Sequence, residues 1–365
     1  MRTDRPRLCF VGWGDHVHVE RWAGWFARAG WDVSVVSFSG TGRYPEGVRQ
    51  YRVGLQGRGP LWIALKLRYL FLRIRPDVVH VHWGHFATPV RQAWSGPLVV
   101  SAWGSDVYER ENFTDHEWNG LGRSLRSADL VTCDSDDLAA AIVRDLSVAP
   151  ENVAVIQWGV DTVLFTPEGP NLRAELKLGD REVILSARNF LPLYNQETVV
   201  EAFALVHAQR PAACLLMKNF GGDAEYVDGI RERIRTRGLD AHCRIVETLP
   251  YDRMPALYRT ADVTVSVPFF DATPMALLEA MASASIPVVS DLPSLREWVV
   301  PGETGFLVDP RDVRALAAAL LSALLWPDRG AALRRSVRDV AVTRASQDAH
   351  MAVVATHYAR IAARA

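Results

Sequence analysis

Short apolar stretches alternate with longer amphipathic stretches along the first half of the chain. The apolar stretches are rich in Val, Ile and Leu and predict strands, whereas the segments between them predict helices. Because these strands are apolar on both faces, they predict a parallel sheet with helices on both sides. The predicted strands are 7–12, 32–38, 77–82, 97–101, 129–133 and 153–156, and the predicted helices are 17–29 and 60–74.

The second half of the chain repeats this alternation. Between the halves, the stretch 157–180 begins without a clear pattern, carries Gly159, Pro167, Gly169 and Pro170, and predicts an interdomain linker. We therefore expect an α/β protein with two Rossmann-like domains facing across a cleft, where the carboxyl ends of the strands bind ligands. The second set of predicted strands is 182–186, 213–217, 243–246, 262–267 and 286–290, and the helices are 196–209, 225–237, 253–260, 274–284 and 312–325.

The composition of the chain limits the classes of protein to which it can belong. A chain of 365 residues is long enough for two domains, and a formal net charge of −1 gives no reason to expect a nucleic-acid partner. The first apolar run ends at Gly12 and is interpreted as a strand, not a secretion signal. No apolar stretch approaches the roughly 20 residues that span a bilayer. The four cysteines form no C-x-x-C pair and predict reduced thiols, so we expect a cytoplasmic protein, at most peripheral to the inner membrane.

One strand–loop–helix unit carries the strongest chemical signal. After strand 262–267, Thr273 suits a helix N-cap and Pro274 suits the first helical position. The free N–H groups of that first turn and the helix dipole predict an anion site suited to a diphosphate. Farther along, Glu279 lies among apolar residues, where a carboxylate needs a partner such as a pair of ribose hydroxyls. The alternative is a Glu at the solvent edge of the helix. The predicted donor-binding segment is Ala272, Thr273, Pro274 and Met275.

Asp271 and Glu279, two acids separated by seven residues, resemble the signature of family-4 retaining glycosyltransferases. The first acid of that family is usually Glu. Segments 152–167 and 297–320 also resemble family segments, in the same order. The resemblance implies the two-domain GT-B fold, in which Asp271 contacts the donor sugar and Glu279 holds the nucleotide ribose. It implies an acceptor-side domain over 1–160, a donor nucleotide-sugar domain over 161–345, and a C-terminal helix over 346–365 that packs back on the first domain.

The resemblance also assigns Arg188, after strand 182–186, to the donor diphosphate. The family usually has a Lys six positions later, where this chain has Tyr194. A cation there would stabilise the leaving diphosphate. Lys218, after strand 213–217, and the hydroxyl of Tyr194 are the two candidates to replace it. Asn195 is predicted to cap the helix that starts at residue 196 and, with Lys218 and Tyr194, belongs to the predicted donor-binding residues.

Loops after the first-half strands carry the candidate acceptor residues. The glycines around the first strand's end allow close approach to a ligand, and the resemblance places this loop at the cleft. Trp103 stands where related enzymes often have His, and a Trp can stack on a sugar. His82 or His85 is expected to take over polar contacts, with His82 as the catalytic candidate; a zinc site is rejected because no third ligand is evident. The predicted acceptor-binding residues are Gly14, Asp15, His16 (with His18 as an alternative), Trp103 and Asp106.

The segment 61–75 alternates apolar residues with four basic ones. Two interpretations stay open. It is a helix that lies weakly on an anionic membrane, which suits a lipid-linked acceptor, or it is a sheet-covering helix with its basic residues in water.

Together, these features predict a retaining glycosyltransferase that moves a sugar from a nucleotide diphosphate-sugar to an acceptor hydroxyl. The acceptor is a small molecule, a glycan or a lipid-linked compound. No cofactor and no divalent metal is expected, because Arg188 and helix dipoles supply positive charge and no D-x-D metal clamp is present. The alternatives are a nucleotide-sugar epimerase and a non-catalytic nucleotide-sugar-binding protein on the same scaffold.

Overall fold

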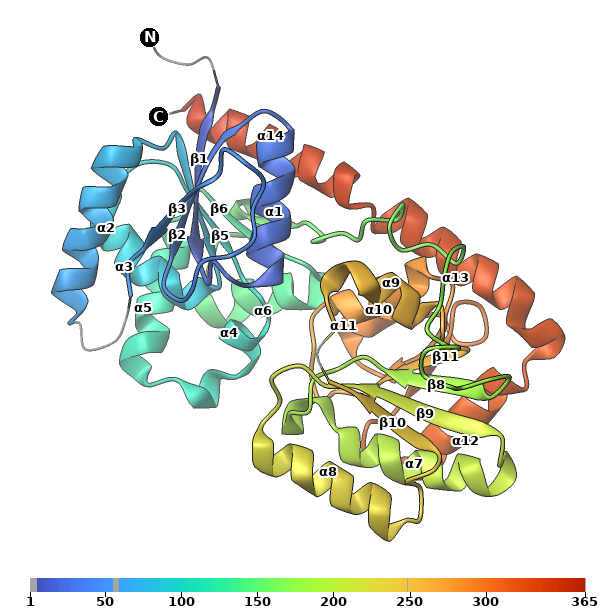
Figure 1. The fold of residues 1–365 in the computed structure, drawn as a ribbon. Coiled ribbons are helices and arrows are strands. Elements are labelled where there is room, and N and C mark those ends of the chain that lie inside the picture. The colour runs from blue at the N-terminus through green and yellow to red at the C-terminus, as the bar shows by residue number, and fades with distance from the viewer. Residues whose placement is uncertain (1–4, 55–58, 248, 365) are drawn as a thin grey trace. The chain divides into compact units, whose positions relative to one another are not determined.

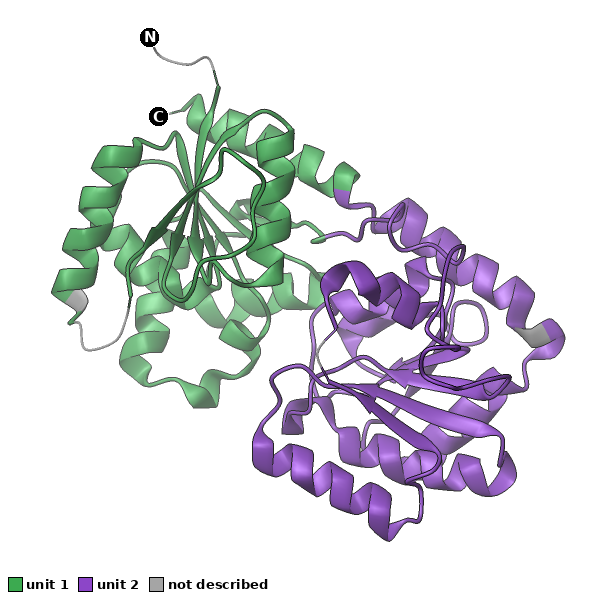
Figure 2. Cartoon of the chain, viewed as in Figure 1, with its two compact units in different colours: residues 1–158, 348–365 green, residues 159–347 purple. Residues whose placement is uncertain are grey.

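The computed structural model describes residues 5–54, 59–247 and 249–364. Figure 1 shows the elements along the chain, and Figure 2 shows its division into two compact units. The first unit consists of residues 1–158 and 348–365, and the second of residues 159–347. Each unit has its own parallel sheet and its own core.

The first unit is built on a seven-stranded sheet in the order β3-β2-β1-β4-β5-β6-β7. Every neighbouring pair is parallel. The strand order reverses between β1 and β4, so this sheet has a switch point where the loops after these two strands diverge. The strands are β1 (Arg7–Gly12), β2 (Asp32–Ser37), β3 (Arg49–Arg52), β4 (Val78–His82), β5 (Leu98–Ser101), β6 (Leu130–Cys133) and β7 (Val153–Val155).

Helices cover both faces of this sheet. The rings of Phe26 on α1 and Tyr358 on α14 lie 5.1 Å apart, and Tyr358 hydrogen-bonds to His80 of β4, so these two helices share one face. Figure 1 shows α2, α3 and α5 on the other face. The helices are α1 (Val17–Arg28), α2 (Pro60–Ile74), α3 (Ala87–Ala93), α4 (Ser105–Tyr108), α5 (Asp115–Arg126), α6 (Asp136–Leu146) and α14 (Gln347–Ala362).

The second unit is built on a six-stranded parallel sheet in the order β10-β9-β8-β11-β12-β13. Here the switch point lies between β8 and β11. The strands are β8 (Glu182–Ser186), β9 (Ala213–Lys218), β10 (Cys243–Val246), β11 (Val263–Ser266), β12 (Ile286–Ser290) and β13 (Phe306–Val308). The helices are α7 (Gln196–Gln209), α8 (Ala224–Thr236), α9 (Met254–Tyr258), α10 (Met275–Ala282), α11 (Pro293–Arg296), α12 (Val313–Leu324) and α13 (Ala331–Arg344).

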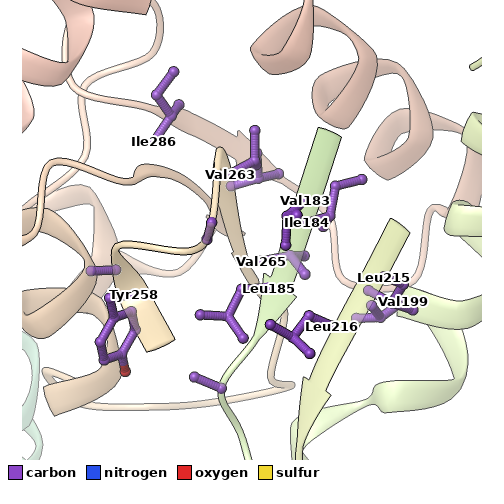
Figure 3. Packing of buried hydrophobic residues seen from close by; sticks show 14 of the residues in the cluster. Val183, Ile184, Leu185, Val199, Leu215, Leu216, Tyr258, Val263, Val265 and Ile286 are labelled. Atoms are coloured by element: carbon purple, nitrogen blue, oxygen red, sulfur yellow. The ribbon is translucent and has the colours of Figure 1, made fainter. Parts of the chain in front are cut away.

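The core of the second unit lies on both faces of its central strands. Figure 3 shows Ile184 and Leu185 of β8 with Leu216 of β9 and Val265 of β11, and all four are fully buried. Burial of such side chains contributes roughly 1.5–3 kcal/mol each. This packing fixes the strand ends that carry the candidate site.

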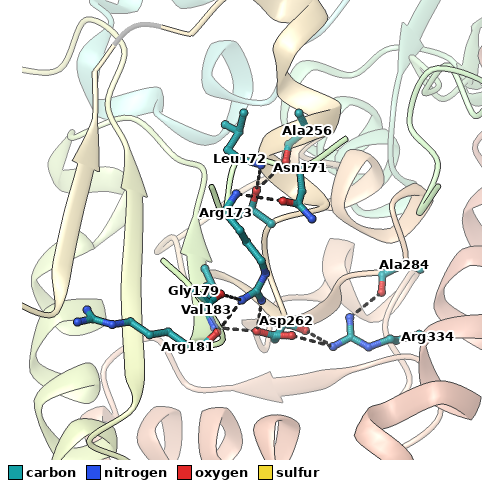
Figure 4. Close-up of polar contacts among 11 residues, drawn as sticks. Asn171, Leu172, Arg173, Gly179, Arg181, Val183, Ala256, Asp262, Ala284 and Arg334 are labelled. Carbon is teal, nitrogen blue, oxygen red and sulfur yellow. Dashed lines mark hydrogen bonds and ion pairs between the residues drawn. The ribbon is translucent and has the colours of Figure 1, made fainter. Parts of the chain in front are cut away.

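The predicted linker 157–180 is wrong from Gly159 onward, because this segment is part of the second unit. Leu172 is buried, and its N–H donates to Thr260 Oγ1 over 2.8 Å. Arg173 forms an ion pair with Asp262 at 2.8 Å, and Figure 4 shows this network. Gly and Pro residues mark irregular backbone, but irregular backbone can still be packed and hydrogen-bonded.

The strands and helices predicted from the sequence are confirmed, most within two residues at each end. Two edge strands, β3 and β13, and six helices, α3, α4, α5, α6, α11 and α13, were not predicted. β3 has the sequence RQYR, with three of its four residues exposed, so it lacks the apolar run that reveals a buried strand. The expected C-terminal helix is present as α14 in the first unit. In the part of the chain that is described, no helix combines the length and hydropathy needed to cross a bilayer.

Candidate functional site

Charged side chains lie at or shortly after the ends of three neighbouring strands of the second sheet. Lys218 is the last residue of β9, Arg188 follows β8, and Asp271 follows β11. Because β9, β8 and β11 are adjacent and parallel, their carboxyl ends meet at one edge of the sheet. Arg188 and Asp271 flank the switch point between β8 and β11, the place where open α/β sheets bind ligands.

Arg188 and Asp271 form a mostly buried ion pair. The guanidinium donates to Asp271 Oδ2 over 2.7 Å, and the two side chains are 10% and 19% exposed. Burial raises the pKa of Asp271, and Arg188 offsets part of this effect. Burial opposes the charge on Arg188, but Asp271 and Tyr194 outweigh it and raise the Arg188 pKa. The guanidinium carbon lies 4.0 Å from the Tyr194 ring centroid, so Tyr194 stacks on Arg188.

The helix after Asp271 begins one residue later than predicted. Pro274 occupies the N-cap, where its C=O accepts from the Leu277 N–H over 2.9 Å. The hydroxyl of Thr273 accepts from Trp298 Nε1 over 3.1 Å, so the expectation that Thr273 is the N-cap is wrong. The N–H groups of Met275 and Ala276 donate to no acceptor among the described residues. They leave the start of α10 open to an anion.

Glu279 is buried, with 6% of its surface exposed. Oε1 accepts from the Tyr251 hydroxyl and Oε2 from the Tyr258 hydroxyl, each over 3.0 Å. The alternative of a solvent-edge Glu is therefore wrong. Burial, and then the charge of Glu279, raise the pKa of Tyr258, so this hydroxyl stays protonated and donates. Sequence reasoning missed both tyrosines; the one available signal was that a carboxylate among apolar residues requires donors.

Lys218 interacts electrostatically with both Arg188 and Glu279. Burial lowers the pKa of Lys218, Glu279 opposes this shift, and Arg188 adds to it. The ammonium group also lies 5.1 Å from the Phe220 ring centroid. Lys218 and Arg188 thus stand at the ends of the neighbouring strands β9 and β8, and the replacement of the missing cation by Lys218 stays a prediction.

Asn195 has a different role from the predicted cap. It occupies the N-cap position of α7 with φ 53°, but its side chain accepts no bond from a helix N–H. Instead, its amide donates to the C=O groups of Val267 and Pro310 over 3.2 and 2.7 Å, and its oxygen accepts from Thr198. Its side chain therefore joins the ends of neighbouring loops instead of capping α7.

In the first unit, the loop after β1 is fastened to the loop after β2. The Gly14 N–H donates to Ser37 Oγ over 3.0 Å, and a Cβ at Gly14 would lie 2.7 Å from Ser37 Cβ. Asp15 is exposed and accepts from the Ser39 hydroxyl and the Gly40 N–H. Gly14 and Asp15 therefore fix the conformation of this loop. The aromatic residues next to them lie where the strands of the first sheet end.

Aromatic rings gather where the strands of the first sheet end. Trp13 stacks on Trp83 with centroids 4.6 Å apart, and Trp103 lies 5.7 Å from Trp13 and 4.8 Å from His16. Trp103 also contacts Trp158 at 4.9 Å. We call Trp13, Trp83, Trp103 and His16 the aromatic edge; all four are half-buried.

The backbone of Trp83 is strained, with φ 74°. For a bulky residue this conformation is rare, costs about 1–3 kcal/mol, and is concentrated at functional sites. The indole Nε1 atoms of Trp83 and Trp103 and Nε2 of His85 are buried and have no hydrogen-bond partner among the described residues.

Asp106 joins the two loops that carry Trp83 and Trp103. It is fully buried, and its carboxylate accepts from the N–H of Gly84 over 2.6 Å and of Trp103 over 2.9 Å. Burial raises the pKa of Asp106 to about 6, against the lowering effect of these backbone donors. Its carboxylate therefore joins two loops and, fully buried, is not open to an acceptor as the sequence suggested.

His82 is also fully buried, beneath the aromatic edge. Its ring lies 6.1 Å from Trp103 and 5.1 Å from Trp22, and stacks on His80 at 4.5 Å. Both ring nitrogens lack a hydrogen-bond partner among the described residues. The predicted direct role of His82 does not fit this arrangement, because its side chain is fully buried among other rings.

Burial lowers the pKa of His82 to about 3. The unfolded chain takes up this proton near pH 6.5 and the folded chain does not, so folding stability falls as pH falls below 6.5. The variant His82→Leu lacks this effect. When the pH falls from 6.5 to 5, its free energy of unfolding is therefore expected to increase by about 2 kcal/mol relative to that of wild type. Tryptophan fluorescence in denaturant measures this, since ten of the twelve tryptophans lie in residues 1–158.

The exposed His116 of the same unit provides the matched control. His116→Leu removes a histidine at an exposed position and so controls for the substitution itself. Parallel curves for His82→Leu and wild type would show that His82 takes up its proton equally in both states.

No three His, Cys, Asp or Glu side chains among the described residues group closely enough to hold a metal ion.

Comparison with known proteins places both units in one family. Residues 14–164 match the model of Glycosyltransferase Family 4, and residues 169–339 match that of Glycosyl transferases group 1. Glycogen synthase of Mycobacterium tuberculosis is 27% identical over 98% of this chain and 92% of its own. D-inositol 3-phosphate glycosyltransferase of Thermobispora bispora is 27% identical over 71% of this chain and 65% of its own.

Solved structures show the same fold. Sucrose-phosphate synthase of Thermosynechococcus elongatus has a TM-score of 0.85 and 20% identity, over 99% of this chain and all of its own. Anabaena HepE, solved with UDP and glucose, has a TM-score of 0.83 and 16% identity, over 98% of this chain and all of its own. The two family matches cover most of the sequence, and the chain belongs to the family-4 (group 1) glycosyltransferases, with the GT-B fold.

Proposed function

We propose that this glycosyltransferase transfers a sugar from a nucleotide diphosphate-sugar to an acceptor hydroxyl with retention of anomeric configuration and without a metal ion. The observation that carries the proposal is the arrangement around α10. A buried Arg188–Asp271 pair lies beside the open start of this helix, and Glu279 lies one turn farther along with two hydroxyl donors.

The donor would bind to the second unit. Arg188 and the N–H groups of Met275 and Ala276 provide positive charge for the diphosphate, in the manner of a helix N-terminus. Glu279 would accept hydrogen bonds from the ribose hydroxyls, and the tyrosine hydroxyls hold its carboxylate in a fixed orientation. HepE structures contain UDP and UDP-glucose, so uridine nucleotides are the first donors to test.

The chemistry would depend on positioning and charge. The bond between the anomeric carbon and the leaving phosphate oxygen breaks, and the acceptor oxygen forms a bond to that carbon on the same face. The acceptor proton passes to the leaving phosphate oxygen. Arg188, with Lys218 as a further cation, would stabilise the negative charge that develops on the diphosphate. Asp271 would contact the donor sugar while its other oxygen remains paired with Arg188.

The acceptor would bind to the aromatic edge of the first unit. Half-buried tryptophans offer flat apolar faces on which a sugar ring stacks. Burial lowers the pKa of His16 to about 4, so this imidazole is uncharged at neutral pH. The edge therefore favours an uncharged sugar or polyol group, whether free, in a glycan or lipid-linked.

Incubation with UDP-glucose and a sugar acceptor in the presence of EDTA tests this function. We expect turnover that requires the acceptor, is unchanged by EDTA, and gives a product with the donor's anomeric configuration by NMR. Panels with GDP-, ADP- and TDP-sugars extend the test, since a bound nucleotide stabilises the fold by mass action. Loss of activity with EDTA would contradict metal independence, and an inverted product would contradict retention. Conversion of the donor sugar without an acceptor would indicate an epimerase, and binding without turnover a non-catalytic protein.

A further inference from the structure

Helix α2 of the first unit has two apolar faces. Leu67, Leu70, Phe71 and Ile74 are buried against the rest of the unit. On the outer face, the side chains of four further apolar residues remain in solvent. We call these the outer stripe: Leu61, Leu65, Tyr69 and Leu72, which are 74, 59, 55 and 67% exposed.

The outer stripe is continuous along the helix. At 3.6 residues per turn, Leu61, Leu65 and Leu72 lie within about 40° of one another around the axis, and Tyr69 lies about 40° beyond. The buried face centres on the opposite side. A helix that only covers a sheet needs one apolar face and a polar outer face. The buried residues satisfy this need, so the outer stripe has no explanation within the first unit.

Basic residues border the outer stripe. Lys66, Arg68 and Arg73 lie on the helix and Arg75 follows it, while no acidic residue occurs from 60 to 75. None of the four forms an ion pair with a described residue. The Lys66 ammonium lies 5.8 Å from the centroid of the Tyr69 ring, so cation and apolar stripe adjoin.

We propose that α2 docks the protein on a membrane surface rich in anionic lipids. The helix lies in the plane of the interface, its outer leucines enter the boundary between headgroups and acyl chains, and its basic residues contact lipid phosphates. Charge decides between this occupant and a second copy of the chain. Pairing two outer stripes would bring like charges together, whereas an anionic surface neutralises them. This inference does not depend on the proposed donor chemistry.

Co-sedimentation of the full chain with vesicles tests the proposal. The probes are vesicles of phosphatidylcholine alone and vesicles with 30 to 50% phosphatidylglycerol, a range on the order of natural anionic membranes. We expect wild-type protein to bind the anionic vesicles and to dissociate at high salt. The variant Leu61→Gln/Leu65→Gln/Leu72→Gln should bind at least about tenfold more weakly. Lys66→Gln/Arg68→Gln/Arg73→Gln should lose the preference for anionic over neutral vesicles.

The chain offers a matched control, since Leu205, Leu325 and Val353 are also exposed and lie on other elements. Changing these three to Gln should leave vesicle binding unchanged, and near-UV circular dichroism checks that each variant is folded. Absence of wild-type binding to anionic vesicles would overturn the proposal, as would equal losses in the control. Self-association in sedimentation velocity that only the outer-stripe variant abolishes would also overturn it, in favour of a dimer.

Discussion

Replacing Arg188 with Ala is expected to lower turnover by about 10²–10³-fold, the usual effect of removing one preorganised donor from a developing negative charge. Arg188 is the cation at the switch point of the second sheet, is mostly buried, and is directed by Asp271 and Tyr194. A charge in this setting is screened little by water, so its loss has a large effect. Steady-state kinetics with a nucleotide-sugar and an acceptor measure the change.

The variant also leaves Asp271 without its partner, and breaking a buried ion pair costs about 3–5 kcal/mol of stability. Thermal unfolding of Arg188→Ala measures this loss, and turnover measured well below its unfolding temperature separates chemistry from stability. Arg210→Ala is the matched control, because Arg210 pairs with Glu182 in the same unit at a more exposed site. Near-wild-type turnover in folded Arg188→Ala would remove Arg188 from the diphosphate role.

Replacing Glu279 with Gln is expected to raise the dissociation constant for the nucleotide diphosphate by about 10–100-fold. Hydrogen bonds to a charged group contribute about 1.5–3 kcal/mol, which corresponds to this range. The change keeps the shape of the side chain, and the amide oxygen can still accept from Tyr251 or Tyr258, so the fold should persist. Isothermal titration calorimetry measures the affinity.

A double-mutant cycle combines Glu279→Gln with a nucleotide that lacks the ribose hydroxyls. If Glu279 holds the ribose, 2′,3′-dideoxy-UDP should bind wild type about as weakly as UDP binds the variant, and the two losses should not add. Glu247→Gln is the control, since Glu247 is a more exposed Glu that pairs with Arg231 in the same unit. Fully additive losses would show that Glu279 acts elsewhere than on the ribose.

Local patterns in the sequence were enough to predict the buried strands, seven of the described helices and one side of the site. The apolar runs of β8 and β11 predict buried strands, and the spacing from Asp271 to Glu279 places both acids on one loop–helix unit. Each of these features spans only a few residues, so the conformational preferences of neighbouring residues are enough to predict it. Apolar runs do not reveal polar or very short edge strands such as β3, because pairing with a neighbour, not composition, makes these segments strands.

Contacts between distant segments required the tertiary structure. Nothing in the sequence near Glu279 indicates that Tyr251 and Tyr258 donate to it, and nothing near Trp103 indicates that Asp106 fixes it to the loop at Gly84. Burial is likewise a property of the folded chain. It placed His82 beneath the aromatic edge and left the outer stripe of α2 in solvent.

The sequence by itself therefore determined where the buried strands and the strongly amphipathic helices form and which residue types follow each strand, because backbone preferences and apolar periodicity act over short windows. Only the tertiary structure decided which of those residues meet, which are paired and which are covered. Such relations depend on strand order and packing between segments that are far apart along the chain.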